Sequence, residues 1–164
     1  EKTWAYESVN ELAQAYHTRP EYLPLPVIFD NKVTKDMVES DRHIKHILDL
    51  GRQANVALFT VGTVRSEALI FQLGYFNEQE KAQLQKDAIG DIFSRFVDGN
   101  GQIVNSQIDE RTIGIQLNEL KSKRHAILVA TGNRKVAAVH AALTAHYTNC
   151  AILDQSLAQL LLDY

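Results

Sequence analysis

The stretch AILVATGNRKVAAVHAALTA, residues 126–145, carries the strongest structural signal in the sequence. It opens with a short apolar run, 126–130, of the kind that fills the middle of a parallel sheet. The tripeptide 131–133 interrupts this run, and from Arg134 the stretch is rich in alanine and lacks glycine and proline. Because alanine has the highest helix propensity, the pattern predicts a strand, a tight loop and then a helix.

This arrangement places Lys135 in the first helical turn, close to Gly132 and Asn133. Unpaired backbone N–H groups and the positive end of the helix dipole meet at such a turn, and together they favour a phosphate or another anion. The sequence GNRK matches neither a Walker loop nor a dinucleotide-binding fingerprint. From these residues alone, a surface lysine after a glycine turn remains the alternative to an anion site.

The composition is that of an ordinary globular domain: 164 residues, 45% hydrophobic and 23% charged. The net charge of −3 argues against extensive electrostatic binding of nucleic acid. No apolar run reaches the roughly 18 residues of a membrane span and no secretory signal is evident, so we expect no membrane partner. Cys150 is the one cysteine, which excludes an internal disulfide and favours a cytoplasmic location. Its apolar setting predicts a buried structural thiol.

Strands and helices are expected to alternate along the chain. Amphipathic or capped segments predict helices at 7–17, 40–50, 77–88, 114–120 and 155–162. Apolar runs predict strands at 25–29, 55–61, 126–130 and 150–153.

Gly51 is expected to end the helix that precedes it. The turn DGNG at 98–101 predicts a β-hairpin between 93–97 and 102–105. Apolar strands that alternate with helices imply an α/β fold with a mostly parallel, Rossmann-like sheet and flanking helices. The hairpin is then an insertion or an antiparallel edge.

In such sheets, ligands bind beyond the carboxyl ends of the strands. Three loops qualify here, at 62–65, 90–91 and 131–135. Arg65 could bind a sugar hydroxyl or a phosphate through its guanidinium, although a solvated loop arginine is the simpler interpretation. Asp91 could accept hydrogen bonds from sugar hydroxyls, or it could cap the turn beside it.

Other polar clusters give weaker evidence for a functional site. The segment DER at 109–111 is interpreted as a solvated connection. His43 and His46 lie on one face of a predicted helix, but no further ligand completes a zinc spacing, so exposed histidines and no metal are expected. The motif G-x-S-x-G of serine nucleophiles is absent, and no motif calls for a cofactor.

Eight motifs occur in the order expected of one family of bacterial regulators. They are YLPLPVIFDN, DRHIKHIL, ANVALFTVGTVRSEAL, LGYFNEQEKAQL, IGDIFSRFVDGNGQIV, RTIGIQL, ILVATGNRKVAAVHAALT and ILDQSLAQLLL. On these motifs the chain resembles, over essentially its whole length, the SorC-type sugar-binding transcriptional regulators. Within that family, the sequences of these motifs are similar to those of the members that control deoxyribonucleoside catabolism.

The resemblance implies a repressor whose effector domain follows an N-terminal helix-turn-helix domain. It implies an effector fold similar to the phosphosugar isomerases of the glucosamine-6-phosphate deaminase and ribose-5-phosphate isomerase type. The inducer would be a phosphorylated sugar, deoxyribose-5-phosphate in the deoxyribonucleoside members, and the repressor would be a homo-oligomer, a dimer or a tetramer. Operator DNA would be bound only through the helix-turn-helix domain.

Neither that domain nor the first part of the effector domain is matched, and Glu1 is not a methionine. We therefore expect residues 1–164 to be a partial effector domain, excised from a longer protein. Such a piece would hold about half of the effector pocket.

The resemblance also implies roles for the candidate residues. Lys135, in a loop with Gly132 and Asn133, matches the family lysine that faces the sugar phosphate. Thr131 stands where the family commonly has glycine, and it still offers a backbone amide to a phosphate.

The resemblance also implies a role for two further loops. Asp91 matches an acidic position that meets sugar hydroxyls. Gly62 matches the strand end that borders the pocket, and Arg65 follows it in the same loop.

Two other functions remain open from the sequence. A phosphosugar isomerase or deaminase of the same fold would need a positioned general base beside the substrate carbon, and no residue is an evident base with a partner. A purely structural oligomerisation domain would bind no ligand at all.

Overall fold

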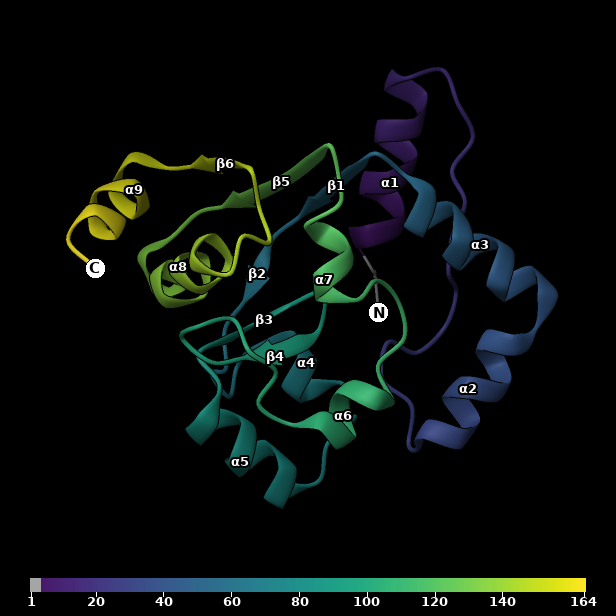
Figure 1. The fold of residues 1–164 in the computed structure, drawn as a ribbon, viewed down its shortest axis with the longest axis horizontal. Coiled ribbons are helices and arrows are strands. Elements are labelled where there is room, and N and C mark those ends of the chain that lie inside the picture. The colour runs from purple at the N-terminus through teal and green to yellow at the C-terminus, as the bar shows by residue number, and fades with distance from the viewer. Residues whose placement is uncertain (1–3) are drawn as a thin grey trace.

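The computed structural model describes residues 4–164 and contains two small sheets (Figure 1). Strands β1 (Val56–Phe59), β5 (His125–Ala130) and β6 (Cys150–Leu153) form a parallel sheet in the order β1-β5-β6. Strands β2 (Val61–Gly62), β3 (Gly90–Ile92) and β4 (Arg95–Val97) form an antiparallel sheet in the order β2-β3-β4. The predicted α/β fold is confirmed, with the antiparallel strands in a sheet of their own.

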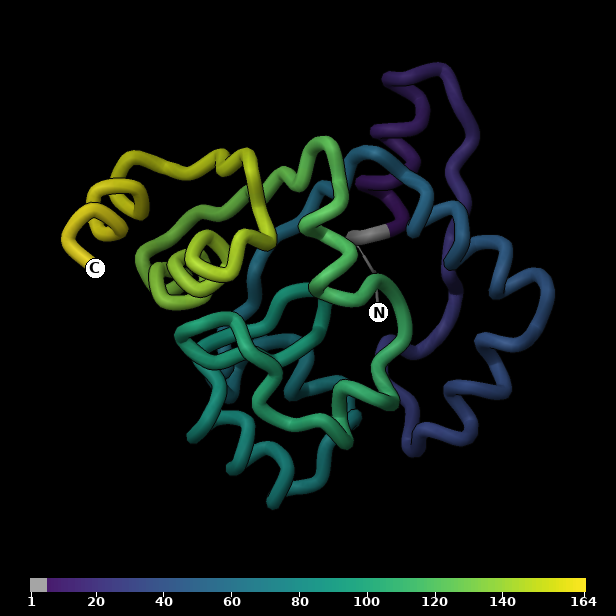
Figure 2. The backbone as a smooth tube through the Cα atoms, viewed as in Figure 1, coloured from purple at the N-terminus to yellow at the C-terminus, as the bar shows by residue number. Residues whose placement is uncertain are grey.

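Helices flank the two sheets. Their bounds are α1 (Trp4–Ala15), α2 (Lys32–Ser40), α3 (Arg42–Gln53), α4 (Leu69–Gln72), α5 (Glu78–Asp87), α6 (Ser106–Glu110), α7 (Leu117–Leu120), α8 (Val136–Thr144) and α9 (Gln155–Leu162). A 3-10 turn, η1 (Asn133–Lys135), precedes α8. The path of the chain places α2 and α3 on the side of the molecule opposite to α9 (Figure 2). Among residues 4–164, no helix combines the length and apolar character that a membrane crossing requires.

The strand, loop and helix predicted for 126–145 are confirmed as β5, η1 and α8. Leu128 of β5 and Val139 of α8 are both fully buried and belong to the same core cluster. Helix α8 lies on one face of the parallel sheet (Figure 1) and also contacts β2 and β3. It therefore packs against both sheets and holds them together.

The opposite face of the parallel sheet stays open to solvent. Leu58 is 55% exposed and Ile152 is 56% exposed, and both point away from α8. Cys150 is also exposed, so the prediction of a buried thiol was wrong. The physical reason is position, because β6 is the edge strand and its residues lack a neighbouring strand on one side.

The apolar run 55–61 does not form one strand, as predicted, because it is divided at Thr60. Its first part, β1, pairs in parallel with β5, and its second part, β2, pairs antiparallel with β3. One continuous run of sequence therefore belongs to both sheets. The end of the parallel strand and the start of the antiparallel strand meet at this residue.

The hairpin forms one strand earlier than the sequence predicted. Strands β3 and β4 are joined by the tight turn Phe93–Ser94, and both residues have positive φ, 51° and 62°. The predicted turn at 98–101 does exist, with Gly101 N donating to Asp98 O at 2.9 Å. It is followed by only one isolated bridge, Val97 to Ile103, so 102–105 is not a strand.

The segment predicted as a strand at 25–29 contributes only one isolated bridge, Ile28 to Thr112. Prolines 24 and 26 supply no N–H groups, which leaves this segment with few donors for a sheet.

The predicted helix 40–50 is longer at its end, because α3 passes through Gly51 and reaches Gln53. The buried Lys123 explains the extension. Its Nζ donates to the carbonyl oxygens of Gly51, Arg52 and Ala54 at 2.6 to 2.8 Å. These carbonyls lie at the end of the helix, where a cation is favourable.

Local sequence signals predicted two other helices correctly. Asn77 and Glu80 form the predicted capping box at the start of α5, with Asn77 Oδ1 accepting from Glu80 N at 2.8 Å. The final helix, α9, has the predicted bounds. The short helices α2, α4 and α6 were not predicted.

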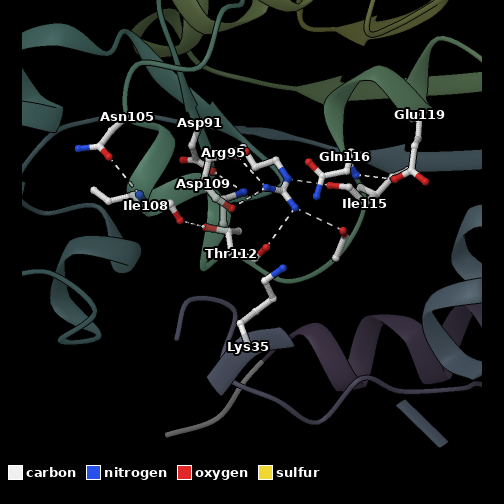
Figure 3. Close-up of polar contacts among 12 residues, drawn as sticks. Lys35, Asp91, Arg95, Asn105, Ile108, Asp109, Thr112, Ile115, Gln116 and Glu119 are labelled. Carbon is white, nitrogen blue, oxygen red and sulfur yellow. Dashed lines mark hydrogen bonds and ion pairs between the residues drawn. The ribbon is translucent and has the colours of Figure 1, made fainter. Parts of the chain in front are cut away.

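Arg95 is the most buried charged residue of the described chain, with 1% of its surface exposed (Figure 3). Its guanidinium donates to Asp109 Oδ1 at 2.6 Å and to the carbonyl oxygens of Asp109, Thr112, Gly114 and Ile115. One side chain of the antiparallel sheet thus holds the whole segment 109–115. The interpretation of 109–111 as a solvated connection was therefore wrong.

Arg111 in the same segment is also buried. It donates to Glu80 Oε1 at 2.9 Å and to Phe29 O at 2.6 Å, so it joins α5 to the N-terminal part of the chain. Of the three charged residues at 109–111, Asp109 therefore pairs with a buried arginine and Arg111 is itself buried, whereas Glu110 is exposed.

We predict that Arg95→Met lowers the free energy of unfolding by about 3–5 kcal/mol, because it leaves Asp109 and several carbonyl groups without their buried donor. Urea unfolding would measure the change. Arg52→Met is the matched control: Arg52 forms surface ion pairs with Asp49 and Glu119, so about 1 kcal/mol or less should be lost. Equal losses in the two variants would contradict a structural role for the Arg95 contacts.

Candidate functional site

A cavity of about 860 Å³ opens where β1 passes into β2. Its polar lining residues are Glu21, Thr60, Thr63, Asp91 and Ser94, Gly62 also lines it, and its walls are largely apolar. The apolar residues include Tyr22, Leu25, Leu58, Ile70, Tyr75 and Phe93. A mostly apolar cavity with a few polar groups is typical of a site for a small molecule.

Gly62 and Asp91 face each other across the β2–β3 pair. A Cβ atom at position 62 would lie 1.9 Å from Asp91 Oδ1, so the carboxylate fills the space that a side chain there would need. Asp91 Oδ2 accepts a hydrogen bond from Ser94 N at 3.1 Å. Glycine at this strand end therefore leaves the carboxylate in its position, because a larger residue would displace it.

Burial raises the pKa of Asp91 from 3.8 to about 6. The N–H of Ser94 and the positive charge of Lys135 act in the opposite direction and lower this pKa, but desolvation is the larger effect. The carboxyl group is thus mostly ionised at neutral pH and becomes protonated in mildly acidic solution. In the ionised form it accepts hydrogen bonds and donates none.

Lys135, in the loop after β5, is not a lining residue but contacts one. Its Nζ lies 3.1 Å from Thr60 Oγ1, within hydrogen-bond distance, and Thr60 lines the cavity. The ammonium group, the Thr60 hydroxyl and the Asp91 carboxylate therefore gather where the carboxyl ends of β1 and β5 meet. The structure brings together Lys135, Gly62 and Asp91 from three separate stretches of sequence.

Gly132 and Asn133 make their contacts toward α9 instead. The backbone of Gly132 has a φ of 92°, a conformation that favours glycine, and its N–H donates to Asp154 Oδ2 at 2.8 Å. The Asn133 side chain accepts from Ser156 Oγ at 2.8 Å. The loop is thus held from both sides, by Lys135 at the cavity and by α9 behind it.

Arg65 does not line the cavity. Its Nε pairs with Glu67 Oε1 at 2.7 Å, and Arg134 Nη1 lies 3.6 Å from the same oxygen. All three side chains are exposed to solvent. The result is a small surface cluster in which one carboxylate sits between two guanidinium groups next to the loop of Lys135.

Thr60, Phe93 and Ser94 are among the cavity residues that sequence reasoning missed. Thr60 did leave a signal, because it is the one hydroxyl residue in the apolar run 55–61. The turn Phe93–Ser94 had no sequence signal. Positive φ values favour glycine or asparagine, and neither residue type is present there. Backbone strain of this kind is found preferentially at functional sites.

No group of three or more histidine, cysteine, aspartate or glutamate side chains in the described part of the chain could hold a metal ion. His43 and His46 are exposed on α3, as expected.

We predict that the Asp91 carboxyl makes the protein less stable as the pH rises from about 4 to about 6. The folded protein holds this proton more tightly than the unfolded chain, so the contribution of Asp91 to stability is present at low pH and is lost through that window. A pKa difference of this size corresponds to about 3 kcal/mol.

Urea unfolding of the protein and of Asp91→Asn at a series of pH values would measure the effect. The stability of the protein relative to the variant should fall across the window and then level off. A difference that does not change with pH would contradict the raised pKa.

Comparison with known proteins gives one consistent result. Residues 1–163 match the family described as "Putative sugar-binding domain". The chain is 56% identical over 161 residues to the deoxyribonucleoside regulator of Bacillus subtilis, covering 98% of this chain and 51% of that protein. The expected resemblance to the deoxyribonucleoside regulators is confirmed, and the chain spans about half the length of this curated relative.

Solved structures agree. A domain described as that of "a possible sugar-binding transcriptional regulator" from Arthrobacter aurescens has a TM-score of 0.85 and 29% identity, covering 98% of this chain and 63% of that one. The full-length sorbitol operon regulator SorC from Klebsiella pneumoniae has a TM-score of 0.82 and 28% identity, covering 92% of this chain and 48% of that one. All three are named as regulators or as a domain of one. The chain therefore belongs to the sugar-binding domain family of SorC-type transcriptional regulators.

Proposed function

We propose that this chain senses a phosphorylated sugar, deoxyribose-5-phosphate, and that it acts within a cytoplasmic repressor of deoxyribonucleoside catabolism genes. The observation that carries the proposal is that Asp91 lines the cavity while the ammonium of Lys135 contacts Thr60 in its wall. The ammonium would bind the phosphate, and the carboxylate would accept hydrogen bonds from sugar hydroxyls.

The cavity suits this class of ligand in size and chemistry. Its volume of about 860 Å³ lies within the range of small-molecule sites and exceeds what a pentose phosphate requires. The largely apolar walls favour a sugar with few hydroxyls, because each hydroxyl buried without a partner is costly. A 2-deoxy sugar has one fewer to satisfy than ribose.

The identity of the sugar also draws support from the relatives. The matching Bacillus subtilis protein is named a deoxyribonucleoside regulator, whereas the SorC relative is a sorbitol operon regulator. We infer the ligand of the first for this chain, because the identity is 56% in the first case and 28% in the second.

The bound sugar phosphate would act as a signal. A ligand that binds one state of a regulator more tightly shifts the population toward that state. The regulator would be a homo-oligomer, and operator DNA would be bound by a domain outside residues 1–164. Release of the operator would follow from the different affinities of the two states for the inducer.

We predict that Lys135→Ala weakens the binding of deoxyribose-5-phosphate by about 10- to 100-fold, because a charge-assisted contact to the phosphate is lost. Calorimetry on the complete gene product would measure the affinity, and operator affinity without inducer should not change. Lys45→Ala removes an exposed lysine of α3 and is the matched control. Unaltered inducer affinity in Lys135→Ala would contradict the assignment.

A second prediction separates the sensor from its alternatives. Deoxyribose-5-phosphate should raise the melting temperature of the complete gene product more than ribose-5-phosphate or deoxyribose does, and it should be recovered unchanged. Conversion of the sugar phosphate would favour the isomerase or deaminase alternative. No shift with any sugar phosphate would favour a purely structural domain.

A further inference from the structure

The carboxylate of Asp154 is bound to the backbone of the loop that carries Lys135, the residue proposed to bind the phosphate. Asp154 lies between β6 and α9, and each of its oxygens accepts one backbone N–H. Oδ2 accepts from Gly132 N at 2.8 Å, and Oδ1 accepts from Leu157 N at 2.9 Å. One side chain therefore holds the Gly132 loop with one oxygen and caps helix α9 with the other.

A second contact strengthens this link between the loop and α9. Ser156 in the first turn of α9 donates from Oγ to Asn133 Oδ1 at 2.8 Å. The loop of Lys135 is thus bound to α9 through two neighbouring residues of the loop and two of the segment that starts the helix.

The charge of Asp154 matters as well as its geometry. The N–H groups of Leu157 and Gly132 lower the pKa of its carboxyl group, so the side chain is ionised at neutral pH. A carboxylate oxygen and a phosphate oxygen are both anionic acceptors, and both bind backbone N–H groups in the same way. The two groups cannot use the Gly132 N–H fully at the same time.

We infer that Asp154 is an internal competitor for the phosphate of the effector, and that the phosphate must displace its Oδ2 from the Gly132 N–H. The inference rests on the proposed function, because it takes the loop of Gly132 and Lys135 to be the phosphate site. Asp154 is then a positioning residue that lowers the affinity for the anionic part of the ligand. Oδ1 keeps its place on Leu157 N throughout, so α9 stays capped when the loop is released.

Asp154→Asn tests the inference in the complete gene product. Asparagine caps helices about as well as aspartate, so α9 should keep its stability. With its oxygen on Leu157 N, however, the amide presents its NH₂ group to Gly132 and cannot accept from that N–H. We expect inorganic phosphate and deoxyribose-5-phosphate to bind about fivefold more tightly in calorimetry, the effect of one exposed charge-assisted hydrogen bond. Binding of deoxyribose, which lacks the phosphate, should not change.

Asp163→Asn is the matched control, because it removes one carboxylate at the other end of α9 and should leave all three affinities unchanged. If Asp154→Asn does not fold, Asp154→Ser replaces it, since serine also caps a helix but has a single oxygen.

The outcomes separate this inference from the proposed function. Binding of deoxyribose-5-phosphate to the unaltered protein, with equal or weaker binding to the Asp154 variant, would overturn the competition alone. Tighter binding of deoxyribose as well would also overturn it, because the effect would not depend on the phosphate. Failure of the unaltered protein to bind either phosphate compound would overturn both the phosphate site and the competition.

Discussion

The close approach of Gly62 and Asp91 is the constraint on which the site depends. Strand β1 of the parallel sheet ends at Phe59, and after Thr60 alone the chain enters the antiparallel sheet as β2. Gly62 leaves the space that the Asp91 carboxylate fills, and the register of β2 with β3 fixes the two residues opposite each other. The half-buried carboxyl, the Thr60 hydroxyl and the Lys135 ammonium meet there because two sheets share one run of sequence.

Buried cations hold the irregular parts of the chain around this junction. Arg95 fixes 109–115, Arg111 joins that segment to α5, and Lys123 closes the end of α3. Each of these side chains has several N–H donors. One residue can therefore donate hydrogen bonds to several carbonyl oxygens that have no partner in a helix or a sheet. The antiparallel sheet is thereby tied to the loops around it, although β2, β3 and β4 are each only two or three residues long.

Local sequence signals located the elements whose stability is local. The capping box of Asn77 and Glu80, the alanine-rich stretch of α8 and the apolar run of β5 each gave the correct element. Errors arose where a distant residue decides the outcome. Gly51 continues α3 because Lys123, far along the chain, binds its carbonyl, and Cys150 is exposed because β6 is an edge strand. The hairpin was misplaced because Phe93 and Ser94 adopt a turn conformation that their residue types disfavour.

By itself, the sequence determined the α/β class, the strand, loop and helix of 126–145, and the family with its candidate residues. These follow from periodicity, propensity and motif order, which act between residues close together in the chain. Only the tertiary structure decided which candidates meet. Gly62 and Asp91 line the cavity and Lys135 contacts its wall at Thr60, whereas Gly132 and Asn133 contact α9 and Arg65 pairs with Glu67. The reason is that strand order and register are set by contacts between segments far apart in the sequence, and no local pattern encodes them.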